Sequence, residues 1–378
     1  MPYAQQVTHK IKSELLDSVF GVSWKKKSEQ IRLSSPYGKV KGWRLASFIM
    51  KAGEDIRREA LVMQVISKLK SWFDEEIPSN QRPYLRPYSI MCVGGDAGLL
   101  ECLPDAKSVD EIKKQTDDFS TLRDYFERAY GPPSRQNNLQ QPHNYPNVVS
   151  GVSGSTIPQP PFSQQYQYNA QPQPPTQNIP PPPPQSTNSD HSADNSITFE
   201  QAQDNFLRSL VGYSLVCFIL QIKDRHNANI LMDREGHLLH IDFGFVLGDT
   251  PKMGKVPLFS ERAPFKLTTE FWDVIGGWNV NEGGQGVRFC KMFEAAFACA
   301  SAHAEELASL VEAAVLNLTS NGARARLLAN GLRQRLKMRG PKDSAEQKQF
   351  IMDLVDASLS SWGTSTYDWL QKSMNGYQ

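Results

Sequence analysis

The sequence contains no hydrophobic run that approaches the roughly 20 residues of a membrane-spanning helix. Its first residues also lack the apolar core of a signal peptide. Neither sign of charge dominates, with 41 basic and 40 acidic residues among 378, which argues against a protein held on nucleic acid by bulk charge. The five cysteines show no CxxC spacing, which favours reduced, mostly buried thiols over zinc or disulfide sites. We therefore expect a cytoplasmic protein whose membrane contact is peripheral.

One segment departs sharply from the rest in composition. Residues 131–195 hold 15 of the 25 prolines and only three charged residues, and they include five consecutive prolines at 180–184. Such a stretch cannot bury enough apolar surface to offset the entropy of ordering, so we expect a disordered insertion. A plain spacer is the simpler interpretation, and a binding site for a proline-binding domain is the alternative.

The sequence on either side of this insertion combines short strands with helices. Asp55 is expected to cap a helix that runs to about Phe73. The other expected elements are strands at 42–51, 89–93, 99–103, 230–232 and 237–241, and helices at 206–222 and over most of 288–369, with breaks near 321–322 and 340–341. The pattern predicts a small mixed lobe, the insertion and then a larger, mostly helical lobe.

The strongest chemical signal lies between Asp224 and Gly244. Asp224 precedes Asn229 by five residues, and Asp242 opens an Asp-Phe-Gly triplet after a short predicted hairpin. Protein kinases use this spacing for a catalytic aspartate and two magnesium ligands. Magnesium prefers hard oxygen ligands, which Asn229 and Asp242 supply. An isolated Asp-Phe-Gly is often only a turn, but the ordered set predicts phosphoryl transfer from ATP.

The order Asp-Arg-His-Asn, followed by His-Ile-Asp-Phe-Gly, resembles the phosphoinositide kinases and their large protein-kinase relatives. The segment Lys51–Glu59 resembles the Lys-x-Gly-Asp-Asp-Leu-Arg-Gln-Asp/Glu of that family. The resemblance implies that Lys51 contacts the ATP phosphates and that Glu59 holds Lys51 in place. Taken alone, these two residues would be read as an ordinary surface pair.

Further segments resemble the beta-like subgroup of the type III phosphatidylinositol 4-kinases. They are Ser-Pro-Tyr-Gly at 35–38 and the stretches 122–126, 212–217, 263–268 and 367–370. The resemblance covers roughly 30–130 and 197–376. It implies transfer of the ATP γ-phosphate to the 4-hydroxyl of phosphatidylinositol, with Mg²⁺ as the metal and Mn²⁺ able to substitute.

The resemblance also implies an α+β, two-lobed protein-kinase-like fold. Residues 1–103 would form the N-lobe and hinge, 104–130 the start of the C-lobe, 131–195 the insertion and 196–378 the rest of the C-lobe. Family members carry strands of the small lobe before the region where this chain begins, so we expect the N-lobe to be incomplete at its start.

By the same resemblance, Ser35 and Tyr37 belong to the ATP site, and the backbone of Glu101 and Leu103 contacts the adenine. Three positions depart from the family pattern: Arg58 replaces a glutamine, Ala228 replaces a glycine, and Cys102 replaces a proline after the hinge glutamate.

The proton acceptor stays open at this point. Spacing favours Asp224, while the resemblance adds His226 and His240, and histidine titrates near neutral pH as general-base work requires. Arg225 is expected to be structural, pairing with loop carbonyls or an acid.

The activation segment, about 243–266, is expected to contact the lipid through Lys252, Lys255 and Lys266. These lysines are scattered, which favours an unphosphorylated head group, although a solvated loop would look the same. The C-terminal stretch 354–374 is amphipathic and would either lie in the membrane interface or pack on the large lobe. The resemblance implies a Golgi-like membrane location, with small GTPases or adaptor proteins as partners.

Two alternatives remain at this stage. One is a phosphoinositide 3-kinase or a related Ser/Thr protein kinase. The other is a catalytically inactive scaffold that uses the proline-rich insertion. Retention of Lys51, Asp224, Asn229 and Asp242 argues against the scaffold.

Overall fold

The computed structural model describes residues 12–133, 197–249, 263–279 and 283–360, apart from positions 13, 54 and 95, together with the backbone of 252–253 and 256–257. The chain divides into two units, and every described residue belongs to the unit made of Met1–Ser134 and Ser196–Gln378. The predicted insertion at 131–195 therefore lies outside the described residues except for its first three positions.

A small antiparallel sheet carries the predicted phosphate lysine. Its strands are β1 (Phe48–Ala52), β2 (Ile90–Cys92) and β3 (Ala97–Glu101), in the order β1-β3-β2. Lys51 on β1 lies opposite Gly98 on β3. A side chain at Gly98 would meet Ile56 and the carbonyl of Met91, so glycine is required for the sheet to approach the start of the following helix.

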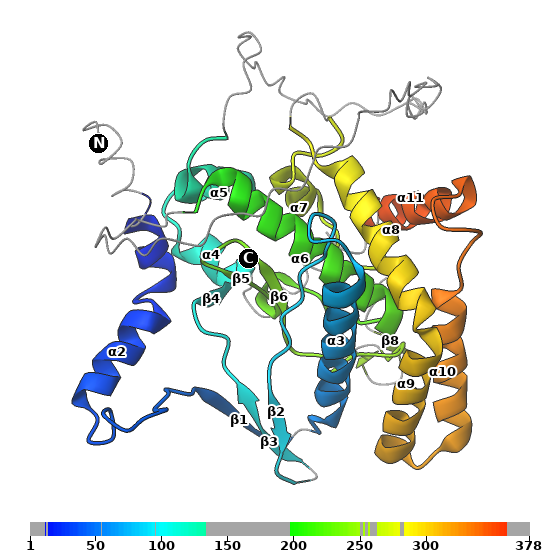
Figure 1. Ribbon diagram of the computed structural model, residues 1–378, viewed down its shortest axis with the longest axis horizontal. Helices are drawn as coiled ribbons and strands as arrows, with labels where there is room; N and C mark the ends of the chain where they lie inside the picture. The colour runs from blue at the N-terminus through cyan, green and yellow to red at the C-terminus, as the bar shows by residue number, and fades with distance from the viewer. Residues whose placement is uncertain are drawn as a thin grey trace, which may run out of the picture. The chain divides into compact units, whose positions relative to one another are not determined.

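The helix α3 (Arg57–Glu76) runs beside this sheet (Figure 1). It buries an apolar stripe that includes Leu61, Val65 and Leu69. The predicted helix is therefore confirmed, but the predicted cap is wrong by one residue, because Ile56 is the N-cap. Asp55 instead accepts a hydrogen bond from the backbone N–H of Arg57 (3.1 Å).

A second antiparallel sheet follows the connection at residues 102–105. It consists of β4 (Ala106–Ser108), β5 (Ile230–Asp233) and β6 (Leu238–His240), in the order β4-β5-β6. At the end of β4, Ser108 and Glu111 form a capping box that starts α4 (Val109–Gln115). The connection 102–105 thus joins one sheet to the other, where the sequence predicts the hinge.

Helix α6 (Phe199–Leu220) is buried on nearly all sides and forms the centre of the larger region (Figure 1). It contacts α5, α8, α10 and β6. The remaining elements are α2 (Trp24–Ser34), α5 (Leu122–Tyr130), η1 (Asn227–Asn229), β7 (Lys252–Met253), β8 (Val256–Pro257), α7 (Thr269–Val274), α8 (Gly286–Ala302), α9 (Ala304–Thr319), α10 (Gly322–Leu336) and α11 (Ala345–Leu359).

The arrangement confirms the expected α+β class, with small sheets and a larger helical part. The breaks predicted near 321–322 and 340–341 separate α9, α10 and α11, and a further break at His303 separates α8 from α9. All five cysteines lie in the described part of the chain and none forms a disulfide, but only Cys217 and Cys299 are buried, so the expectation of mostly buried cysteines is wrong. Within the described ranges, none of the helices has the length and apolar character needed to cross a membrane.

Candidate active site

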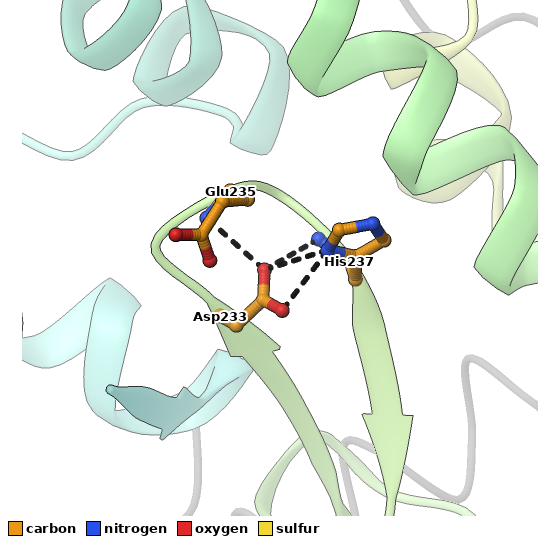
Figure 2. A group of neighbouring side chains, drawn as sticks. All are labelled: Asp233, Glu235 and His237. Carbon is orange, nitrogen blue, oxygen red and sulfur yellow. Dashed lines mark hydrogen bonds and ion pairs between the residues drawn. The ribbon is translucent and has the colours of Figure 1, made fainter. Parts of the chain in front are cut away.

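The hairpin between β5 and β6 is closed by the side chain of Asp233. Its Oδ1 accepts the backbone N–H groups of Glu235 (3.0 Å) and His237 (2.8 Å), and its Oδ2 lies 3.0 Å from His237 Nδ1 (Figure 2). Gly236 adopts a φ of +85°, which a glycine tolerates without strain. The ring of Tyr84 stacks on His237 with centroids 4.0 Å apart. These contacts fix the turn that the sequence predicts at 233–236.

Asp233, Glu235 and His237 are also close enough together to suggest a metal site. Hydrogen bonds within the turn already occupy the carboxylate of Asp233, which is 4% exposed. The same cluster therefore accounts for the register of the hairpin. That register, in turn, sets which residues face each other at the predicted catalytic end.

The ladder brings the two predicted magnesium ligands to neighbouring positions. Ile230 pairs with His240, and the N–H of Ile241 donates to the carbonyl of Asn229 (3.2 Å), so Asp242 follows the partner of Asn229. Asn229 Nδ2 donates to the carbonyl of Asp224 (3.1 Å), so the side-chain oxygen of Asn229 is the atom that the predicted metal site would use. An amide oxygen and a carboxylate fit the hard-oxygen preference of magnesium.

Arg225 ties this loop together from inside. It is 1% exposed and donates to the carbonyls of Lys223 (3.3 Å) and Ile241 (2.7 Å), and also to that of Asp242. Its guanidinium lies 5.2 Å from the ring centre of Phe243. The structural role predicted for Arg225 is confirmed, and it fixes the backbone at the position of Asp242, whose φ is +58°.

Lys51 and Glu59 form the ion pair that the resemblance implies. Lys51 Nζ lies 3.5 Å from Glu59 Oε2, and Glu59 is 5% exposed. An ordinary surface pair would leave the carboxylate in water, so burial excludes that alternative. The other oxygen of Glu59 accepts a hydrogen bond from the hydroxyl of Tyr88. No signal in the sequence marks Tyr88, because it lies 29 positions from Glu59.

The three candidate proton acceptors lie in different surroundings. His240 is 4% exposed, stacks on Tyr213 with centroids 4.7 Å apart, and directs Nδ1 toward the thiol of Cys217 (3.7 Å). Burial, with smaller contributions from Arg225 and Lys266, holds the pKa of His240 well below its usual range. His226 is also buried, at 7% exposure, whereas Asp224 is half-buried.

The predicted hinge residues lie at the end of β3. The N–H of Glu101 donates to the carbonyl of Ser89 (2.9 Å), and its carboxylate accepts the N–H of the same serine (2.9 Å). The N–H of Cys102 donates to the carbonyl of Ser47 (2.9 Å). Leu103 packs against the core beyond this point. Contact of the Glu101 and Leu103 backbone with adenine stays a prediction.

Ser35 and Tyr37 lie in a turn at the C-terminal end of α2. The hydroxyl of Ser35 accepts the N–H of Tyr37 (3.2 Å), and Tyr37 is 70% exposed. Their predicted contact with ATP also stays a prediction.

The lysines expected at the lipid differ in position. Lys252 begins β7, which pairs with β8, whereas Lys255 and the side chain of Lys252 lie outside the described residues. Lys266 is 3% exposed, and its charge makes a small contribution to the lowered pKa of His240 on the predicted catalytic hairpin.

The amphipathic stretch at 354–374 is described only as far as residue 360. Leu354 and Leu359 belong to α11, which packs on α8, and both side chains are partly buried against the core. Packing on the large lobe therefore accounts for this part of the stretch, and the rest lies outside the described residues.

A further ionic contact joins α3, the activation segment and α10. Asp249 pairs with Arg58 (2.9 Å) through one oxygen and with Arg324 (3.0 Å) through the other. Arg58 is one of the three departures from the family pattern, and it immediately precedes Glu59. Only the tertiary fold brings Arg58 and Asp249 together, because they lie 191 positions apart in the sequence.

Comparison with known proteins matches residues 46–320 to the family described as "Phosphatidylinositol 3- and 4-kinase". The chain is 33% identical over 364 residues to a phosphatidylinositol 4-kinase of Dictyostelium discoideum, covering 95% of this chain and 24% of that protein. It is 32% identical over 356 residues to phosphatidylinositol 4-kinase beta of Rattus norvegicus, covering 93% and 34%. It is 31% identical over 366 residues to phosphatidylinositol 4-kinase beta 1 of Arabidopsis thaliana, covering 95% and 26%.

The chain thus spans about a quarter to a third of the length of these relatives. The family match extends over 275 of the 378 residues, from the residues before β1 to the end of α9, and includes both the Lys51–Glu59 pair and the predicted catalytic hairpin. The chain belongs to the phosphatidylinositol 3- and 4-kinase family.

Proposed function

We propose that this chain is the catalytic region of a phosphatidylinositol 4-kinase, which transfers the γ-phosphate of ATP to the 4-hydroxyl of phosphatidylinositol. The observation that carries the proposal is the backbone pairing just beyond the β5–β6 ladder, where Ile241, the neighbour of Asp242, bonds to Asn229, together with the buried Lys51–Glu59 pair. The names of the relatives support the lipid acceptor and the 4-position.

Four side chains would hold the nucleotide and its metal. Lys51 would direct its ammonium at the phosphates, and Glu59 would keep it from turning away. The oxygen of Asn229 and the carboxylate of Asp242 would hold Mg²⁺, for which Mn²⁺ could substitute. When bound, the metal neutralises negative charge on the phosphates. The backbone of Glu101 and Leu103, with Ser35 and Tyr37, would complete the nucleotide site.

The acceptor oxygen would form a bond to the γ-phosphorus as the bond from that phosphorus to the ADP oxygen breaks. The hydroxyl proton would pass to Asp224 or His226, which belong to the loop before Asn229. His240 is stacked beneath Tyr213 and faces a thiol, so we assign it to positioning the hairpin. Separate replacement of Asp224 and His226 by asparagine distinguishes the two acceptors. A general base must be deprotonated to act, so only loss of the true base removes the acidic limb of the pH profile.

The lipid would approach the activation segment, where Lys252 and Lys255 could contact the head group and Lys266 would lie deeper, beside His240. We propose peripheral contact with the membrane for this reason. A Golgi location, small GTPase or adaptor partners, and a proline-binding domain at the insertion rest on the resemblance and on composition alone. Localisation of a tagged chain, with and without residues 131–195, tests the first and the last of these.

Product analysis tests the proposed function. The purified chain is incubated with labelled ATP, Mg²⁺ and phosphatidylinositol vesicles, and the product is separated from the 3- and 5-phosphate isomers. We expect phosphatidylinositol 4-phosphate. A 3-phosphate product, or labelled protein with unlabelled lipid, would indicate one of the alternative kinases. No turnover with any acceptor, despite intact fold and ATP binding, would favour the scaffold.

A further inference from the structure

The carboxylate of Glu59 is held by two different partners. One oxygen pairs with Lys51 at 3.5 Å, and the other accepts the hydroxyl of Tyr88. A charge-assisted contact of nitrogen to oxygen is usually about 2.7–2.9 Å, so the contact with Lys51 is long and constrains the carboxylate weakly. The hydroxyl of Tyr88 lies within hydrogen-bonding distance of the other oxygen. Tyr88 therefore supplies a second restraint on the orientation of Glu59, from the side opposite the oxygen that pairs with Lys51.

Tyr88 can act only as a donor to this carboxylate. Its side chain is 6% exposed, and burial together with the adjacent Glu59 raises its pKa far above the ordinary value of a tyrosine. The phenol thus keeps its proton at any working pH, and a phenol facing a carboxylate has its hydrogen to offer. Its backbone N–H also contacts the sulfur of Met63 (3.5 Å), one turn of α3 beyond Glu59.

The backbone that carries Tyr88 is anchored to α6. The hydroxyl of Tyr213 on α6 donates to the carbonyl of Arg86 (3.2 Å), and the N–H of Tyr84 donates to the carbonyl of Arg208 (3.0 Å). Tyr213 is also the residue that stacks on His240. These contacts fix residues 84–88 relative to the hairpin that carries His240. The hydrogen bond from Tyr88 then fixes Glu59 relative to the same hairpin.

We propose that Tyr88 is a positioning residue that holds Glu59 so that Lys51 faces the nucleotide phosphates at a fixed distance from the magnesium ligands. This inference rests on the proposed function, because it requires ATP to bind at Lys51. The simpler interpretation is that Tyr88 is a packed core tyrosine that happens to satisfy its hydroxyl. The two interpretations differ in whether removing the hydroxyl should weaken binding of the nucleotide's phosphates more than binding of its adenosine part.

Tyr88→Phe keeps the ring and deletes only the hydroxyl. We expect the dissociation constant of ATP with Mg²⁺ to rise about tenfold, the lower end of what a hydrogen bond to a charged group contributes. Adenosine has no phosphates, so its dissociation constant should change less than about twofold. Tyr125→Phe is the matched control, because Tyr125 is fully buried and its hydroxyl has no hydrogen-bond partner in the described structure. It should leave both constants unchanged.

A double-mutant cycle tests whether Tyr88 acts through Lys51. In a Lys51→Ala background, Tyr88→Phe should change ATP affinity less than about twofold, because the group that it positions has been removed. Equal loss of ATP and adenosine binding, no loss of either, or a tenfold loss that persists without Lys51 would each overturn the inference and leave the proposed function standing. A wild-type chain that fails to bind ATP would overturn the proposed function and this inference with it.

Discussion

Gly212 lies inside α6 at a point where no side chain fits. A β-carbon at this position would sit 2.4 Å from the carbonyl oxygen of Tyr84 and 3.1 Å from the side chain of Leu85. The backbone of Tyr84 cannot easily move away, because its N–H donates to the carbonyl of Arg208 one turn earlier on α6 (3.0 Å). We therefore expect the close contact in Gly212→Ala to cancel or exceed the stability that alanine gains as the better helix former.

Gly331 in α10 is the matched comparison. A β-carbon there would meet only the end of the Arg335 side chain, at 3.3 Å, and that flexible group can turn aside. Replacing a glycine inside a helix by alanine gains about 0.5–1 kcal/mol from helix propensity at both sites. Overpacking against a fixed backbone costs about 1–3 kcal/mol, and this applies only to Gly212. The two substitutions should therefore differ by about 1–3 kcal/mol in the free energy of unfolding.

Urea unfolding followed by circular dichroism measures this difference. Gly331→Ala should raise the midpoint, and Gly212→Ala should lower it or leave it unchanged. Gly212 packs against residues 84–85, next to Tyr88, so a side chain there should displace Tyr88. The Gly212→Ala variant should therefore also bind ATP more weakly, whereas the Gly331→Ala variant should bind it normally. Equal stabilisation by both substitutions would refute the packing of residues 84–85 against α6.

Three further predictions concern the site and its surroundings. Asp242→Asn should abolish turnover but change the free energy of unfolding by less than about 0.5 kcal/mol, because asparagine tolerates the positive φ. A kinase assay and urea unfolding measure the two effects, and an active variant would contradict the assignment of Asp242 to magnesium. Asp249→Asn removes two exposed ion pairs with arginines, so it should lower the free energy of unfolding by about 1 kcal/mol in low salt and by less in 1 M NaCl. An effect that does not depend on salt would contradict the ionic contact. Burial, and next to it the neighbouring Glu76, raises the pKa of Cys299 to about 12. Iodoacetamide at pH 8 should therefore alkylate Cys299 at least about 100-fold more slowly than the exposed Cys92. Peptide mass spectrometry measures both rates, which should become equal in urea.

The catalytic hairpin could be predicted from the sequence because its geometry is local. A turn of fixed length between two strands determines which residues face each other, so the spacing of Asn229 and Asp242 implies their proximity once the turn is recognised. The Lys51–Glu59 pair is similar, since a strand, a glycine turn and the first turn of a helix separate the two residues. The Asp55 cap was misplaced by one residue because an aspartate can bind the first N–H groups of a helix from more than one position.

The positions of Tyr88 and Lys266 could not be predicted in this way. Tyr88 meets Glu59 only because residues 84–88 return along α3 and α6, and nothing in the composition of that segment encodes the return. Lys266 has the charge of a surface residue but is 3% exposed, and its charge contributes to the lowered pKa of His240. Such placements follow from tertiary packing, which a periodic pattern does not contain.

The joint between the two sheets is stiffened differently here from the family pattern. A proline after the hinge glutamate would restrict φ covalently, and heating or denaturant would not release it. Cys102 has no such restraint, but it supplies an N–H that a proline lacks, and that N–H is bonded to Ser47 just before β1. Rigidity at this joint therefore depends on a contact that water can replace, so the angle between the lobes should become more variable on warming well before either lobe unfolds.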